Sequence, residues 1–208
     1  MLLDLDGTLL DLHFDNYFWL QHIPRRYAER HALAPEHARA LLHQRFKALQ
    51  GTMQWYCLDH WGAELRLDIL ALKREVQHLI APRPNVGAFL SALNDAGKQV
   101  VLTTNAHPHS LALKMQRVPL QRHFDAVRSS HQYNCPKESE AFWEALDQDL
   151  EFERSRTLFV DDNDAVLDAA QRFGIARVFG IRQPDSRGVH IDRGPYRRLH
   201  DFNELLPI

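Results

Sequence analysis

The sequence predicts an α/β fold in which a parallel sheet, flanked by helices, carries an inserted segment of helices. Three observations predict it. Short apolar runs, typical of strands buried on both faces of a sheet, alternate with amphipathic helices from residue 86 onward. Residues 16–80 show apolar positions at helical spacing and no convincing strand. Polar side chains directly follow three of the apolar runs, at the strand ends where parallel sheets carry their functional residues.

The first strand is expected at residues 1–3, directly before Asp4. Because only three residues precede Asp4, the start of the sheet is expected to be weakly held. In the helical segment, Pro24 is expected to break or kink the first helix, and Pro35 to open the second in the first-turn position that proline tolerates.

The rest of the chain is expected to alternate helices with strands after a linker at residues 81–84. The expected helices cover residues 86–93, 111–118, 142–150 and 166–173, and the expected strands cover residues 99–103, 126–129, 157–160 and 176–181. The C-terminal stretch is expected to be irregular, apart from a short helix through Phe202 and Leu205.

Composition indicates an ordinary globular protein. Of its 208 residues 45% are hydrophobic and 25% are charged, which is enough for one well-buried core and a modest second unit. The 25 Lys and Arg residues nearly balance the 27 Asp and Glu residues, so the net charge of -2 gives no electrostatic case for nucleic acid or a membrane surface as a partner. The chain has neither an apolar run of membrane-spanning length nor a basic and then apolar leader, so a cytoplasmic location is expected.

Asp4 and Asp6 are the first candidate site residues. Positions 4 and 6 of a strand share one face, so two carboxylates would point together and repel each other unless a cation lies between them. Carboxylate oxygens suit Mg²⁺ better than softer metals. A lone Asp-x-Asp pair is also compatible with ordinary polar residues at a strand end, but the longer string DLDGTLLD is far more specific.

Thr104 and Lys137 are the next candidates. The hydroxyl of Thr104, beside Asn105, follows an apolar strand and can donate to phosphate oxygens, although Thr-Asn in this position is commonly a helix cap. Lys137 follows a proline and is expected to open a helix, where the helix dipole does not favour a cation. A lysine in that position therefore needs another reason.

Asp161 and Asp162 end another apolar strand. Acidic residues near a helix start can be caps, but capping needs one acid and does not need two adjacent ones at the end of a buried strand. Asp164 is expected to be the capping residue.

These four groups, in this order, resemble the four signatures of the haloacid dehalogenase superfamily of aspartate-nucleophile phosphatases. The resemblance implies a Rossmann-like core formed by residues 1–14 and 82–208. It also implies a helical cap, residues 15–81, that is inserted after the first strand and hinged near residues 11–15 and 81–84. The first strand is shorter before Asp4 than is usual in the family.

The resemblance also implies the chemistry. Asp4 is the expected nucleophile and Asp6 the expected general acid and base, while Mg²⁺ is the expected cofactor. The expected phosphate-binding residues are Thr104, Asn105 and Lys137, and the expected metal ligands are Asp4, the carbonyl of Asp6, and Asp161 or Asp162. The second aspartate, Asp6, favours phosphate monoesters over haloacids as substrates.

Three further strings, at residues 15–19, 55–59 and 104–109, resemble the purine 5'-nucleotidases of this family, which act on GMP and IMP. A purine could stack on Tyr17, Trp55 or Tyr56, although these rings are equally compatible with packing inside the cap. The expected partner is therefore a small phosphate monoester, such as GMP or IMP. Two alternatives remain open: a phosphatase or phosphomutase acting on small sugar phosphates, and a catalytically idle binding protein with the same fold.

Overall fold

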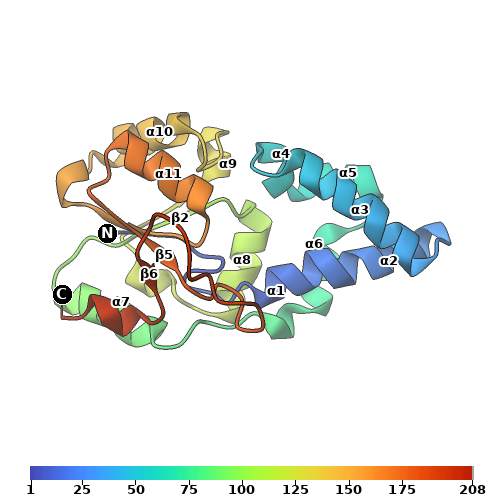
Figure 1. The fold of residues 1–208 in the computed structure, drawn as a ribbon, viewed down its shortest axis with the longest axis horizontal. Coiled ribbons are helices and arrows are strands. Elements are labelled where there is room, and N and C mark those ends of the chain that lie inside the picture. The colour runs from blue at the N-terminus through green and yellow to red at the C-terminus, as the bar shows by residue number, and fades with distance from the viewer. Residues whose placement is uncertain (208) are drawn as a thin grey trace.

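The computed structural model describes residues 1–207 and contains a six-stranded parallel sheet with the strand order β3-β2-β1-β4-β5-β6 (Figure 1). Its strands are β1 (Leu2–Leu3), β2 (Val101–Thr104), β3 (Ala126–Ser129), β4 (Leu158–Val160), β5 (Arg177–Ile181) and β6 (Arg198–Leu199). Because β1 lies between β2 and β4, the chain that leaves it emerges at the centre of the sheet's carboxyl edge. The expected α/β fold is confirmed, and each of the five expected strands is present.

The short strand β1 is extended by main-chain hydrogen bonds at both ends. The N–H of Val101 donates to the carbonyl of Met1 at 2.9 Å, and the N–H of Asp4 donates to the carbonyl of Val160 at 3.0 Å. Asp4 therefore continues the strand, and its side chain starts from a backbone that the sheet holds in place. The weak start expected from three residues is not what the structure shows.

Neighbouring residues of β1 pack into opposite faces of the sheet, as the period of a strand requires. Leu2 belongs to an apolar cluster with Phe142 and Phe159, on the face covered by α10 (Glu140–Leu150) and α11 (Asp164–Phe173). Leu3 belongs to a second cluster with Phe89, on the face covered by α7 (Val86–Asp95) and α8 (Pro108–Arg117). Layers of helices on both faces explain why the central strands β1 and β4 are apolar throughout.

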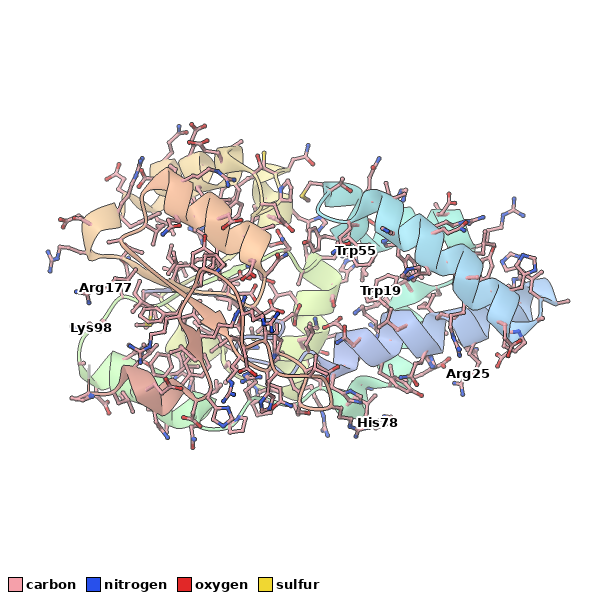
Figure 2. All side chains as sticks on the ribbon, viewed as in Figure 1. Trp19, Arg25, Trp55, His78, Lys98 and Arg177 are labelled. Carbon is pink, nitrogen blue, oxygen red and sulfur yellow. The ribbon has the colours of Figure 1, made fainter. Side chains whose placement is uncertain are left out.

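All regular elements between residues 13 and 79 are helices or helical turns, and they lie beyond one end of the sheet (Figure 1). The elements are α1 (His13–Tyr17), a π-helical turn (Phe18–His22), α2 (Ile23–His31), α3 (Pro35–Leu49), α4 (Met53–Tyr56), α5 (Leu58–Leu65), α6 (Ile69–Glu75) and a 3₁₀ turn (Gln77–Leu79). Figure 2 shows Trp19 and Trp55 between α3 and the rod formed by α1 and α2. None of the helices within residues 1–207 combines the length and the hydropathy that a membrane crossing requires.

The two prolines of this segment have different effects. Pro35 occupies the first turn of α3, as expected. Pro24 does not end the first helix, because helical backbone angles continue through the caps from α1 to α2. A π-helical turn directly precedes α2, and it widens the helix where the N–H that proline lacks would have bonded.

Three local expectations were wrong. The C-terminal stretch is not irregular up to its short helix, because Arg198 and Leu199 form strand β6 beside β5. Lys137 does not open a helix: it lies in a turn between α9 (Ser130–Tyr133) and α10, for which Ser139 is the N-cap. Asp164 is not the cap of α11, because Asn163 is, and the Asp164 carboxylate pairs with Arg198 at 2.6 Å.

Candidate active site

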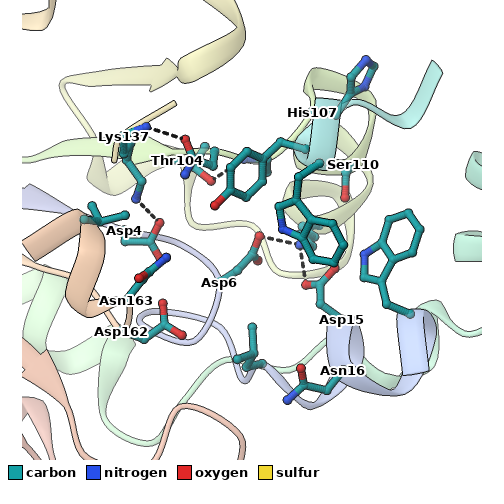
Figure 3. Close-up of a pocket in the computed structure, with 18 of the residues that line it drawn as sticks. Asp4, Asp6, Asp15, Asn16, Thr104, His107, Ser110, Lys137, Asp162 and Asn163 are labelled. Carbon is teal, nitrogen blue, oxygen red and sulfur yellow. Dashed lines mark hydrogen bonds and ion pairs between the residues drawn. The ribbon is translucent and has the colours of Figure 1, made fainter. Parts of the chain in front are cut away.

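A cavity of about 400 Å³ opens where the carboxyl ends of the central strands face the helical segment (Figure 3). Its lining residues come from the ends of β1, β2 and β4, from α8, α11 and the turn before α10, and from the inserted helices. Among them are all of the core residues that the sequence singled out: Asp4, Asp6, Thr104, Asn105, Lys137, Asp161 and Asp162. Four segments far apart in the chain therefore meet at one cavity, as the parallel topology requires.

Lys137 lies at the centre of the acidic groups. Its Nζ atom donates to Oδ1 of Asp4 at 2.5 Å, to Oδ2 of Asp161 at 2.7 Å and to the carbonyl of Thr103 at 3.1 Å. Its side chain is 2% exposed. Burial lowers the pKa of Lys137, but the two carboxylates outweigh that effect and raise the pKa above its ordinary value, so the amine is charged. This cation is the explanation for a lysine beside the strand ends.

Asn105 and Glu138 hold the turn that carries Lys137. Oδ1 of Asn105 accepts the main-chain N–H of Lys137 at 3.0 Å, and the amide of Asn105 donates to Glu138 at 3.0 Å. Thr104 is 1% exposed, and its hydroxyl oxygen accepts the N–H of Ala106 at 3.0 Å, which leaves the hydroxyl hydrogen free to donate into the cavity. Asn105 thus positions Lys137 and is not itself free.

Asp4, Asp161 and Asp162 form a group of carboxylates whose ligand atoms lie within 4.8 Å of one another. Oδ2 of Asp4 is buried and has no hydrogen-bond partner within residues 1–207. Burial raises the pKa of Asp4 to about 7, with Lys137 opposing the rise and Asp161 adding to it. Burial and the charges of Asp161 and Asp4 also raise the pKa of Asp162 well above its usual range. The group therefore lacks positive charge, which a divalent cation would supply.

Asp161 and Asp162 differ in how many oxygens are free. Both oxygens of Asp161 are engaged, one by Lys137 at 2.7 Å and the other by the N–H of Asn163 at 2.9 Å. Asp162 has no such hydrogen bond within the described residues, and it packs against Gly7. A Cβ atom at Gly7, whose φ is +83°, would lie 2.4 Å from Oδ2 of Asp162, so only glycine fits there.

Asp6 lies apart from that group. Its Oδ2 atom pairs with Nζ of Lys114 at 2.7 Å, and Lys114 also pairs with Asp15 at 2.7 Å. Burial raises the pKa of Asp6 to about 6, with Lys114 opposing the rise and Asp15 and Asp4 adding to it. Sequence reasoning missed Lys114 and Asp15. The only sequence signal for Lys114 is its place in the helix that follows the strand ending at Thr104.

The three aromatic residues of the helical segment have different positions. Trp55 lines the cavity and its ring lies 5.7 Å from that of Phe46, so it packs and faces the cavity at once. Tyr56 also lines the cavity, and its hydroxyl donates to Glu138 at 2.5 Å. Tyr17 is not among the lining residues found within residues 1–207, and its ring packs 6.4 Å from that of His22. Trp19 lines the cavity and was not expected.

A second group of possible metal ligands comprises Cys57, Asp59 and His107, of which only His107 lines the cavity among the described residues. Cys57 and His107 already accept main-chain N–H groups, and Asp59 is exposed. The thiol of Cys57 accepts the N–H of His60 at 3.4 Å, Nδ1 of His107 accepts the N–H of His109 at 3.3 Å, and Nε2 of His107 faces Asp59 at 3.6 Å. We assign no metal to this group.

Comparison with known proteins identifies the family to which this arrangement belongs. The family model for haloacid dehalogenase-like hydrolases matches residues 1–174. The chain belongs to the haloacid dehalogenase-like hydrolase family. This hydrolase is 41% identical over 207 residues to the GMP/IMP nucleotidase YrfG of Escherichia coli strain K12, a match that covers 100% of this chain and 93% of that protein. The expected class of enzyme, a phosphatase of this family, is thereby confirmed.

Solved structures show the same fold. A HAD phosphatase from Thermococcus onnurineus superposes with a TM-score of 0.78 and 20% identity, covering 99% of this hydrolase and 96% of that chain. The HAD-hydrolase YfnB of Bacillus subtilis bound to magnesium superposes with a TM-score of 0.66 and 17% identity. The superposition covers 98% of this hydrolase and 95% of that chain. At these identities the similarity concerns the fold alone.

Proposed function

We propose that this hydrolase is a magnesium-dependent purine 5'-nucleotidase that converts GMP and IMP to nucleoside and phosphate through an aspartyl phosphate on Asp4. The observation that carries the proposal is Asp4 itself: one of its oxygens is held by Lys137 at 2.5 Å, and the other is unpaired at the cavity. A carboxylate that is fixed but not satisfied is what nucleophilic attack on phosphorus requires. The choice of nucleotide rests on the 41% identical relative named for GMP and IMP.

We also propose that residues 15–81 act as a cap over a core formed by residues 1–14 and 82–208. The two connections between these parts lie side by side: the N–H of Asp11 donates to the carbonyl of Ala81, and the N–H of Arg83 donates to the carbonyl of Leu9, each at 2.9 Å. Two adjacent crossings are a suitable hinge, because motion there disturbs few other contacts.

Mg²⁺ fits the acidic group, because the group offers hard oxygen donors within 4.8 Å of one another and an excess of negative charge. The proposed ligands are Asp4, the carbonyl of Asp6, and Asp162. Asp162 is preferred to Asp161 because both oxygens of Asp161 are already engaged. When bound, Mg²⁺ would offset the repulsion between an anionic nucleophile and an anionic substrate.

The chain's own residues perform the rest of the reaction. Asp4 attacks phosphorus while Lys137 orients it and balances charge on the phosphoryl oxygens. The free hydroxyl hydrogen of Thr104 donates to one of those oxygens, and Asn105 keeps Lys137 in place. Asp6 gives a proton to the leaving oxygen and then takes one from the water that hydrolyses the aspartyl phosphate.

A panel of phosphate monoesters tests the proposed function. With Mg²⁺ present, we expect kcat/KM for GMP and IMP to exceed the values for hexose and triose phosphates by at least about tenfold, a difference that about 1.4 kcal/mol of recognition supplies. A preference for sugar phosphates would replace the nucleotidase assignment by the sugar phosphatase alternative. Absence of phosphate release from every ester would leave a binding protein.

The metal assignment predicts different effects of two similar substitutions. Asp162→Asn is expected to raise the Mg²⁺ concentration needed for half-maximal activity by about tenfold or more, because it removes an anionic ligand. Asp161→Asn is expected to change that concentration less and to lower stability, because it weakens the partner of Lys137. Activity titrated with Mg²⁺, together with urea unfolding, separates the two. A larger metal effect from Asp161→Asn would reverse the assignment.

Trp55 is the aromatic residue best placed to contact a base. Trp55→Ala is expected to raise KM for GMP by about tenfold and KM for p-nitrophenyl phosphate by far less, because base stacking contributes about 1–3 kcal/mol. Phe46→Leu is the matched control, because Phe46 packs against Trp55 and does not line the cavity among the described residues. Equal KM changes for the two substrates would mean that Trp55 only packs.

A further inference from the structure

A chain of four charged side chains, two buried lysines and two partly buried aspartates, joins Asp6 to the inserted helices. Nζ of Lys114, on α8, lies 2.7 Å from Oδ2 of Asp6 and 2.7 Å from Oδ2 of Asp15, on α1. Oδ1 of Asp15 accepts from Nζ of Lys73, on α6, at 2.8 Å. In Figure 3 the dashed lines from Asp6 and Asp15 meet at one amine nitrogen. The charges therefore alternate along the chain from Asp6 to Lys73.

Packing alone does not explain these lysines. The side chains of Lys73 and Lys114 are each 2% exposed, and Nζ of Lys73 lies 4.5 Å from the centre of the Phe18 ring. Taking an ammonium group out of water is costly, and apolar side chains of similar volume usually stabilise a protein as well or better. A buried charge chain that ends on a catalytic carboxylate therefore points to a role in the reaction.

The chain fixes one oxygen of Asp6 and leaves the other free. Oδ2 bonds to Lys114, whereas Oδ1 has no hydrogen-bond partner within residues 1–207, and Asp6 lines the cavity. The ion pair at Oδ2 restricts rotation about the side-chain bonds of Asp6, so it also limits the directions in which Oδ1 can point. A misplacement of about 1 Å in such a group can slow a reaction about 100-fold.

We propose that Lys114 is the positioning residue for proton transfer by Asp6, and that Asp15 and Lys73 hold Lys114 in place from the inserted helices. The inference rests on the proposed function. In the first step Asp4 bonds to phosphorus, and the bond from phosphorus to the leaving oxygen breaks with its electron pair on that oxygen. The oxygen of a nucleoside takes the proton of Asp6, whereas p-nitrophenolate is a weak base and leaves without it.

Two charge-neutral double variants of the full chain test the proposal. Lys114→Met with Asp15→Asn and Lys73→Met with Asp15→Asn each remove one buried cation and one partly buried anion from the same chain. Only the first takes the amine away from Asp6. With Mg²⁺ and with enzyme in excess over substrate, release of guanosine from GMP and of p-nitrophenolate from p-nitrophenyl phosphate reports the first step alone.

We expect the Lys114→Met pair to slow guanosine release by about 100-fold, the lower range of general acid catalysis, and to slow p-nitrophenolate release by less than about threefold. The Lys73→Met pair leaves the amine of Lys114 beside Asp6 and removes only groups that hold it, so guanosine release is expected to slow by less than about tenfold and p-nitrophenolate release by less than about threefold. Lys114→Arg, which keeps the charge but moves the donor, is expected to recover part of the guanosine rate.

Equal slowing of both releases by the Lys114→Met pair, or slowing of neither, would overturn the proposal. If urea unfolding shows that this pair does not fold, Lys114→Arg decides: guanosine release must slow more than p-nitrophenolate release, and equal slowing again overturns the proposal. Failure of the proposed function looks different, because the wild-type protein would then release no guanosine from GMP.

Discussion

Asp4→Asn is expected to abolish turnover of every phosphate monoester while the protein stays folded. Asparagine cannot form an aspartyl phosphate, and loss of a nucleophile typically lowers kcat by about 10⁴-fold or more. The fold is expected to survive, because an amide oxygen can still accept from Lys137 and because one charge leaves a group whose carboxylates repel each other. Phosphate release and urea unfolding, both with Mg²⁺, measure the two effects.

Asp149→Asn is the matched control for this substitution. Asp149 pairs with Arg128 at 2.5 Å and is 37% exposed, so the same chemical change is made away from the cavity. We expect the control to keep wild-type kcat. Activity of Asp4→Asn above about one hundredth of wild type would remove Asp4 as the nucleophile.

Lys137→Met is expected to lower both activity and stability. Without the amine, Asp4 and Asp161 are left as buried carboxylates that repel each other, and removal of one partner from a buried ion pair costs about 3–5 kcal/mol. Activity is expected to fall at least 100-fold, because the nucleophile loses its orientation. The free energy of unfolding, measured by urea titration, and kcat for GMP test both statements.

A second substitution, at position 161, tests whether the lost stability comes from repulsion between the carboxylates. Adding Asp161→Asn to Lys137→Met is expected to recover part of the lost stability but not the activity, because it relieves repulsion without restoring the cation. Lys98→Met serves as the control, because Lys98 is exposed and lies far from the cavity (Figure 2). A double variant no more stable than Lys137→Met would contradict the electrostatic explanation.

The sheet was predictable from the sequence because its central strands are apolar on both faces and its helices have one apolar side. β6 was not predictable, because two residues, Arg198 and Leu199, carry no periodic pattern. Their place is set by tertiary contacts, namely pairing with β5 and the Arg198–Asp164 ion pair. The capping role expected for Asp164 was wrong for the same reason: a distant arginine takes its carboxylate, and Asn163 caps the helix.

The core of the site was predictable where strand ends mark it. Asp4, Thr104 and Asp161 follow apolar runs, and the topology alone brings them together. The pairing of Lys114 with Asp6 was not predictable, because a lysine inside an amphipathic helix has the same pattern whether it faces water or a buried carboxylate. Tyr17 is the opposite case, a residue expected at the site that does not line the cavity among the described residues. Its ring packs against His22, and the sequence does not distinguish the two positions.

Trapping the intermediate tests the central claim most directly. Asp6→Asn protein, whose second step should be slow, is mixed with p-nitrophenyl phosphate and Mg²⁺, quenched and reduced with borohydride, which converts an aspartyl phosphate to homoserine. Peptide mass spectrometry is predicted to find homoserine at position 4 and unchanged aspartate at positions 161 and 162. An unmodified Asp4 in protein that has released p-nitrophenolate, or homoserine at another position, would contradict the account.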